Sequence, residues 1–175
     1  MYKLVVSGTA IRFGSMTSSS ELVAVDLTGD ERGFIQHALY QWQFSAAGTP
    51  FPIQVLGLAT WGEFDKLTGR LSYAVTGGRP LTDLDWARVL YLTECSWASG
   101  LVGAGPDFAI VIGFSDKEAV GLLRGLQRKI GGSKRAELLF PGGSRPRSAE
   151  QIEERKRWAA KVRREQQGRQ YPPGL

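Results

Sequence analysis

A helix-start signal occurs four times along this chain and limits the folds that it can adopt. Each signal is a Ser or Thr followed three residues later by Glu or Gln, at Thr28–Glu31, Thr60–Glu63, Ser115–Glu118 and Ser148–Gln151. In this capping box the hydroxyl accepts a hydrogen bond from a backbone N–H of the first turn, and the second side chain accepts one from the backbone N–H of the capping residue. The signals predict helices that begin directly after these four positions.

Apolar residues at helical spacing support the first three of these helices. The spacing of three and four residues continues to about Ser45 in the first, to Gly77 in the second and to Gly131–Gly132 in the third. The predicted inward residues are Phe34, Ile35, Ala38, Leu39 and Trp42, then Phe64, Leu67, Leu71 and Ala74, then Ala119, Leu122, Leu123, Leu126 and Ile130.

Residues 83–99 fit both a helix and a strand. As a helix, the segment has Thr82 as its N-cap and Asp85 as its third residue, and Trp86, Val89 and Thr93 share a face. As a strand, its apolar residues alternate from Val89 to Trp97. The cap and the length favour the helix.

Four short β-prone runs complete the predicted fold. They are Tyr2–Val6, Glu21–Leu27, Ile53–Leu58 and Phe108–Ile112. Because they are interleaved with helices, we expect residues 1–140 to form a mixed α/β (α+β) domain, with one sheet of about four strands covered by helices. Residues 141–147 are rich in Pro and Gly and predict a linker, and residues 148–175 predict a basic helix and a tail.

Composition excludes several classes of protein. The 42% hydrophobic and 22% charged residues are usual for a soluble globular chain. The single cysteine excludes an internal disulfide, and with the single histidine it argues against a metal site. The sequence contains no signal peptide and no apolar run of about 18 residues. We therefore expect a cytoplasmic protein without cofactor, and the Gly-, Ala- and Arg-rich composition suggests a bacterial one.

Charge divides the chain into two unequal parts. Residues 124–175 contain 14 basic and 5 acidic side chains, a net charge of +9. Residues 1–123 contain 8 basic and 12 acidic side chains, a net charge of −4. This asymmetry predicts an anionic partner for the C-terminal part.

The predicted helix after Ser115 contains a basic stripe opposite its leucines. Lys117, Gly121, Arg124 and Arg128 have the spacing of one helix face, Lys129 flanks them, and Lys134 and Arg135 follow closely. The stripe would suit the phosphates of a nucleic acid or an acidic protein surface. The alternative interpretation is a solvated helix face.

The predicted C-terminal helix is basic and only weakly amphipathic. Its cations are Arg155, Lys156, Arg157, Lys161, Arg163 and Arg164, and its apolar residues are Ile152, Trp158, Ala159 and Val162. Three interpretations are open. The helix docks on the body or on a second copy of the chain; it becomes ordered only on a partner, with Trp158 as the anchor; or it lies on an anionic membrane, for which its apolar face is narrow.

Two carboxylates are candidates for chemistry. Glu94 lies in an apolar segment, so it needs a partner, and Arg88 or Arg70 would serve. Asp107 follows the Gly100–Gly105 loop and would supply a second carboxylate. That loop precedes Pro106 and a predicted strand rather than a helix, so it predicts a tight turn and not a phosphate loop.

Other polar residues give weaker indications. Gly113–Ser115, at a predicted helix start, would suit an anion. His37 fits a structural or surface role, and it would serve Cys95 as a base only if the fold brought the two together.

The sequence therefore predicts an intracellular, non-enzymatic binding or regulatory protein whose partner is a nucleic acid or an acidic protein. The predicted binding residues are Lys117, Arg124, Arg128, Lys129, Arg155, Arg157, Trp158, Lys161 and Arg164. One alternative is a small-ligand protein or enzyme with a carboxylate pocket, formed by Glu94 and Asp107 near the Gly100–Gly105 loop. A second is a self-assembling structural protein. No motif is specific enough to indicate a known family.

Overall fold

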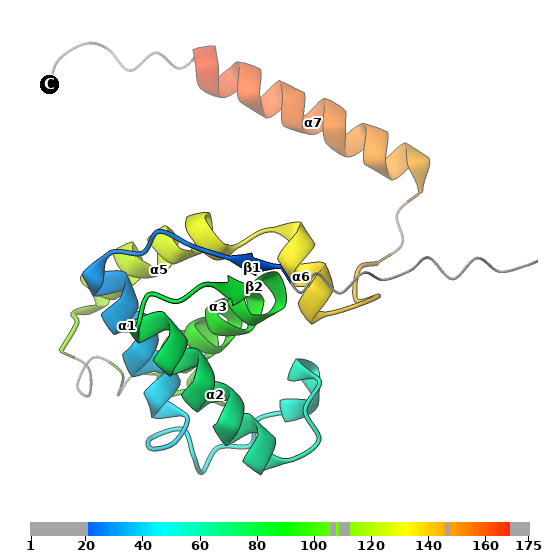
Figure 1. Cartoon of the computed structure of the whole chain (residues 1–175). Helices are drawn as coiled ribbons and strands as arrows, with labels where there is room; N and C mark the ends of the chain where they lie inside the picture. The colour runs from blue at the N-terminus through cyan, green and yellow to red at the C-terminus, as the bar shows by residue number, and fades with distance from the viewer. Residues whose placement is uncertain (1–20, 106–107, 109–112, 146–147, 169–175) are drawn as a thin grey trace, which may run out of the picture. The chain divides into compact units, whose positions relative to one another are not determined.

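The computed structural model describes residues 21–105, 108, 113–145 and 148–168, and this part of the chain is mostly helical (Figure 1). Its helices are α1 (Gly29–Gln41), α2 (Trp61–Thr76), α3 (Asp83–Ala98), α5 (Asp116–Ile130), α6 (Ser133–Leu139), α7 (Ala149–Gly168) and the short 3-10 helix η1 (Ile53–Leu56). Two strands of two residues each, β1 (Leu22–Val23) and β2 (Leu81–Thr82), pair antiparallel with Leu22 opposite Thr82.

The predicted α/β fold with a sheet of about four strands is wrong. Of the predicted strand Glu21–Leu27, only Leu22–Val23 pairs with another strand. The alternation of apolar and polar residues nonetheless corresponds to alternating burial. Val23 and Val25 are partly buried and Leu27 is buried, while the residues between them are exposed. The segment is extended and packs one side on the helices, but β2 offers only two residues to pair with.

The predicted strand Ile53–Leu58 is also wrong, since Ile53–Leu56 form η1. Pro52 has no backbone N–H to donate to a sheet, and Gly57 ends the turn with a left-handed φ of 75°. Ile53 and Leu56 are both buried, because residues three apart share one side of a 3-10 helix. A short, mostly apolar run such as Ile53–Leu58 does not distinguish this arrangement from a strand.

The two other predicted strands fall largely outside the described residues. This holds for all of Tyr2–Val6 and for residues 109–112 of the predicted strand Phe108–Ile112. Phe108 itself is buried, and its ring packs edge-on against Phe34 with the centroids 5.5 Å apart.

The capping boxes are confirmed at all four predicted helix starts. At α1 the Thr28 hydroxyl accepts from the Glu31 backbone N–H at 3.2 Å, and a Glu31 carboxylate oxygen accepts from the Thr28 N–H at 2.8 Å. The same reciprocal bonds cap α2 and α5. At α7, Ser148 and Gln151 exchange bonds of 3.1 and 3.2 Å. Local sequence alone thus positions the beginnings of four helices.

Helix α3 is confirmed as a helix and contacts α1, α5, α6 and β2. It is buried on more than the predicted face, since Ala87, Leu92 and Ser96 are buried together with Trp86 and Val89. The Trp86 indole N–H also donates to the Val23 carbonyl at 2.8 Å, which holds β1 against α3. The core of this part of the chain is built around α3.

The chain divides into two compact units, residues 1–139 and residues 140–175. The first contains α1 to α6, and buried Phe34, Phe64 and Trp86 are among the largest side chains of its core. The second contains α7, a continuous helix whose apolar side chains face solvent, with Ile152 43% and Trp158 65% exposed. Within the described residues no helix combines the length and the apolar character that crossing a membrane requires.

The Gly100–Gly105 loop is a tight turn packed against the end of α3, as predicted. Gly105 has a left-handed φ of 49°. At Gly103, an added Cβ would lie 2.7 Å from the Ser96 carbonyl oxygen and would overlap the Cys95 carbonyl. The loop passes α3 so closely at Gly103 that only glycine fits there, which explains Gly103, as the left-handed φ explains Gly105, without a phosphate ligand.

Gly103→Ala should therefore lower the free energy of unfolding by about 1–3 kcal/mol, because backbone atoms must move to admit the methyl group. Gly100→Ala is the matched control, since no atom lies within 4 Å of its added Cβ, and we expect a change within about 0.5 kcal/mol. Urea unfolding of both variants measures the difference. Equal effects of the two substitutions would contradict the close packing of the loop on α3.

Candidate anion-binding surfaces

The basic stripe of α5 lies where the sequence placed it, on the exposed side of the helix. Lys117, Arg124 and Arg128 are exposed, while the opposite face buries Leu123 and Leu126. Gly121 leaves open space between the cations, since nothing lies within 4 Å of its added Cβ. Arg124 also donates to the Gln127 side-chain oxygen at 2.7 Å.

Three neighbouring cations are engaged by carboxylates of the same unit. The Lys129 ammonium lies 2.7 Å from Glu31, the Arg135 guanidinium 2.8 Å from Asp83 and the Lys134 ammonium 3.4 Å from Asp83. Arg135 further donates to the Ile130 carbonyl at the end of α5 at 2.8 Å. Lys129 and Arg135 therefore hold α5 and α6 to α1 and α3.

Two buried aspartates at the beginning of α3, Asp83 and Asp85, bind arginines from three helices. Asp85 accepts two parallel hydrogen bonds from Arg70, at 2.8 and 2.9 Å, and one from Arg88 at 3.2 Å. Burial acts to raise the pKa of Asp85, but the two guanidinium groups outweigh burial and hold it below its ordinary value. The pKa of Asp83 is also lowered, chiefly by the hydrogen bond from Arg135.

The boundary between the neutral and the basic part of the chain lies at the end of α6 and not before residue 124. Residues 1–139 contain 13 basic and 13 acidic side chains and are neutral overall. Residues 140–175 contain 9 basic and 4 acidic side chains, so the whole net charge of +5 belongs to the second unit. Up to the end of α6, acidic side chains therefore equal the basic ones in number, and the excess of cations is confined to residues 140–175.

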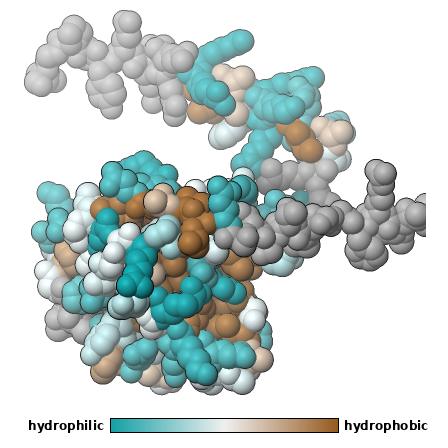
Figure 2. All heavy atoms as spheres, in the orientation of Figure 1, coloured by the Kyte–Doolittle hydropathy of each residue, from teal (hydrophilic) through white to brown (hydrophobic). Residues whose placement is uncertain are grey.

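Helix α7 presents its cations to solvent. Two weak surface pairs are present, with Lys156 3.6 Å from Glu153 and Lys161 3.9 Å from Glu165. Within the described residues of this unit, its four arginines form no ion pair; they are Arg155, Arg157, Arg163 and Arg164. In Figure 2 the described part of this unit is largely hydrophilic, with separate small hydrophobic areas.

Glu94 does not bind Arg70 or Arg88, because both arginines contact Asp85. One Glu94 oxygen instead accepts from the Gln127 amide N–H at 2.6 Å. The Gln127 side-chain oxygen in turn accepts from Arg124, so the three side chains are connected by hydrogen bonds. These side chains line a hollow of about 310 Å³ between α3 and α5, whose other walls are mostly apolar. Asp107 lies outside the described residues, so the predicted pair of carboxylates stays a prediction.

The other candidate residues lack the environment that chemistry would need. Burial raises the pKa of the Cys95 thiol, and the charge of Glu94 adds to this, which disfavours the thiolate. His37 is exposed on α1. At Gly113–Ser115, the chain's own Glu118 carboxylate accepts from the Ser115 N–H at 2.9 Å and takes the place of an external anion. Among the described residues, no three His, Cys, Asp or Glu side chains gather as metal ligands.

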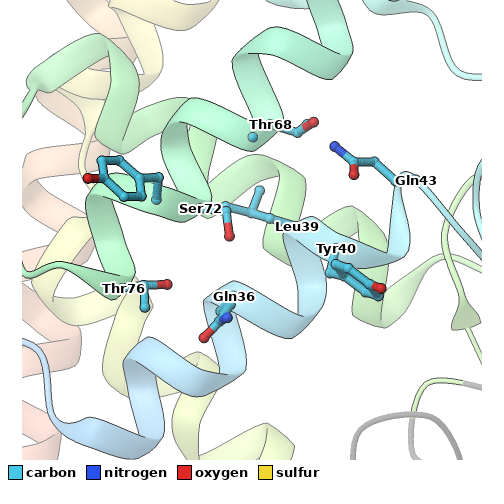
Figure 3. Close-up of a pocket in the computed structure, with 9 residues that line it drawn as sticks. Gln36, Leu39, Tyr40, Gln43, Thr68, Ser72 and Thr76 are labelled. Carbon is cyan, nitrogen blue, oxygen red and sulfur yellow. The ribbon is translucent and has the colours of Figure 1, made fainter.

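A second hollow, also of about 310 Å³, lies between α1 and α2 (Figure 3). Gln36 and Tyr40 line it from α1 and Gln43 from the turn that follows α1, and small residues such as Ser72 and Thr76 line it from α2. It contains neither a charged side chain nor any of the candidate residues. Its neutral polar lining gives it no preference for an anion.

Comparison of the chain with protein-family models, with curated proteins and with solved structures finds no match.

Arg135→Gln should reduce the free energy of unfolding by about 1.5–3 kcal/mol, because it removes the charge-assisted hydrogen bond to the largely buried Asp83 and the bond to the Ile130 carbonyl. Arg128→Gln removes the same charge from an exposed position of α5 and should change stability by no more than about 0.5 kcal/mol. Chemical denaturation distinguishes the two. If both variants unfold alike, Arg135 does not hold α6 to α3.

Acid should destabilise the first unit through Asp83 and Asp85. Since their pKa values are lower in the folded chain, their contribution is complete above the ordinary aspartate pKa of about 4 and is lost as pH falls through the folded values. The urea midpoint should therefore be level near neutral pH and fall below about pH 4. Asp83→Asn should lower the midpoint at pH 7 and make the acid-induced fall smaller. An unchanged acid-induced fall would argue against this pairing.

Proposed function

We propose that this protein is a non-enzymatic binding or regulatory protein of the cytoplasm that attaches to a nucleic acid or an acidic protein through α7. The observation that carries the proposal is the confinement of the net charge of +5 to residues 140–175, while residues 1–139 are neutral. A neutral folded body with a basic helix is suited to long-range attraction of a polyanion.

The exposure of α7 supports the same function. Its arginines form no ion pair with the described residues, and Trp158 is 65% exposed. Arginine binds phosphate and carboxylate groups through two parallel hydrogen bonds, and an exposed tryptophan is a frequent anchor in interfaces. The α5 stripe, with Lys117, Arg124 and Arg128, offers a second and smaller set of exposed cations on the body.

The hollow between α3 and α5 supports a small-ligand function less well. Its single carboxylate, Glu94, already accepts a hydrogen bond at 2.6 Å from Gln127. Acid–base catalysis requires groups held in different protonation states, and the hollow provides no second carboxylate among the described residues. The balance of observations therefore favours binding.

Replacing all four α7 arginines by glutamine in the full chain should greatly weaken the binding of a labelled nucleic acid or of polyglutamate. For a nucleic acid, the slope of log K against log salt should flatten by at least about 1.4, since each lost phosphate contact contributes about 0.7–0.9. Fluorescence anisotropy across a salt series measures the slope, and circular dichroism checks that α7 persists.

The matched body variant is Arg124→Gln with Arg128→Gln, for which we expect a smaller change of slope. Absence of any salt-dependent binding by the unsubstituted protein would refute the proposed function. Equal binding by the four-arginine variant and the unsubstituted protein would have the same consequence.

A further inference from the structure

Helix α7 has two faces of different charge, and its glutamates define them. At 3.6 residues per turn, all four glutamates fall within roughly one third of the helix circumference. Three cations share this third, which we call the mixed-charge face; its residues are Glu150, Glu153, Glu154, Arg157, Lys161, Arg164 and Glu165.

The opposite third of α7 contains no carboxylate. Its residues follow the spacing i, i+3, i+4, i+7, i+10 and i+11, which places them on one face. We call it the acid-free face; its residues are Ile152, Arg155, Lys156, Ala159, Val162 and Arg163. Three cations and three apolar side chains therefore share one surface, and Trp158 lies between the two faces.

The mixed-charge face neutralises itself. Arg157 borders a hollow together with Glu150, Glu153 and Glu154, and Lys161 pairs with Glu165 at 3.9 Å. With four carboxylates and three cations, this face repels a polyanion slightly. On the acid-free face, Arg155 and Arg163 form no ion pair with a described residue, and Lys156 has only the exposed pair with Glu153 at 3.6 Å.

We propose that the acid-free face of α7 is the docking face of this protein and that its occupant is the phosphodiester backbone of a nucleic acid. The proposal rests on the proposed function and selects one partner for it. A helix with cations on one face and carboxylates on the other approaches a uniform polyanion in one orientation, because the reverse orientation brings carboxylates against phosphates.

The composition of the acid-free face favours a nucleic acid over an acidic protein. Its apolar residues are one Ile, one Val and one Ala, and Ala159 and Val162 are already partly buried. Protein interfaces depend on a few aromatic or large apolar anchors enclosed at their centre, whereas this face has no aromatic residue and its one large exposed apolar residue, Ile152, lies at one end, in the first turn of α7. Its strongest groups are arginines, which suit phosphate oxygens, and the charged residues of the flanking segments are the further cations Arg145, Arg147 and Arg169.

The dimensions of α7 also suit this partner. Twenty residues form a helix about 30 Å long, and an α-helix fits the major groove of duplex DNA, with phosphates along both edges. The same face would follow the backbone of a single strand, so the phosphodiester is the chemistry common to both. The choice between duplex and single strand is left to the experiment.

Two double variants of the full chain test whether the acid-free face binds the nucleic acid. Arg155→Gln with Arg163→Gln removes two charges from the acid-free face. Arg157→Gln with Arg164→Gln removes two from the mixed-charge face and is the matched control. The sequence predicted both of these residues to bind, and their place on the mixed-charge face removes them from that set. All four arginines are exposed and lack ion pairs with the described residues of their unit. Each variant is titrated by fluorescence anisotropy against labelled duplex DNA, single-stranded DNA and polyglutamate over a salt series, with circular dichroism as the check on helix content.

The acid-free pair should flatten the salt slope by about 1.8 for duplex DNA or about 1.4 for a single strand, and the control pair should change it little. If both pairs of substitutions flattened the salt slope equally, the assignment of the acid-free face as the docking face would be wrong, while the proposed function would stand. Tight binding of polyglutamate without binding of either DNA would overturn the nucleic-acid partner alone. Failure to bind any probe would refute the proposed function together with this inference.

Discussion

The pairing of buried carboxylates with cations from distant helices is the constraint on which the first unit depends. Helix α3 is buried on several sides, so the aspartates of its first turn lie where a charge must be compensated. Asp85 takes Arg70 from α2 and Arg88 from α3 itself, and Asp83 takes Arg135 from α6. Thr82 caps α3, and the two aspartates connect α3 to its neighbours. The cations used in this way cannot serve a partner.

Local sequence predicted the beginnings of helices well because a capping box is a contact between residues three apart. It failed on strands because pairing requires a partner that is distant in sequence. Val23, Val25 and Leu27 alternate as a strand should, yet β2 supplies only two residues to pair with. The ambiguity of residues 83–99 has a related cause, since a helix buried on several faces loses the single apolar stripe that identifies it.

The sequence predicted the positions of the candidate surfaces, but not which of their cations are paired with carboxylates. Spacing alone placed Lys117, Arg124 and Arg128 on the exposed side of α5. It gave no indication that Lys129 contacts Glu31, which is 98 residues away in the chain, or that Arg135 contacts Asp83, which is 52 residues away. The acidic first turns of α1 and α3 were attributed to helix capping, although the same carboxylates also balance the cations of α5 and α6. Counting charges along the chain therefore overestimated the free cations of residues 124–139.

Helix α7 separates the interactions that stabilise it from those left to a partner. Short helices are marginal in water, and pairs of opposite charge along one side raise their stability. Among the described residues, the mixed-charge face supplies one such pair, Lys161–Glu165, and the Ser148–Gln151 cap adds to it. The acid-free face then contributes little to helix stability, so its arginines can bind phosphates without loss of the helix. A helix with evenly distributed glutamates would have the same net charge and the same local stability, but it would present no surface from which carboxylates are absent.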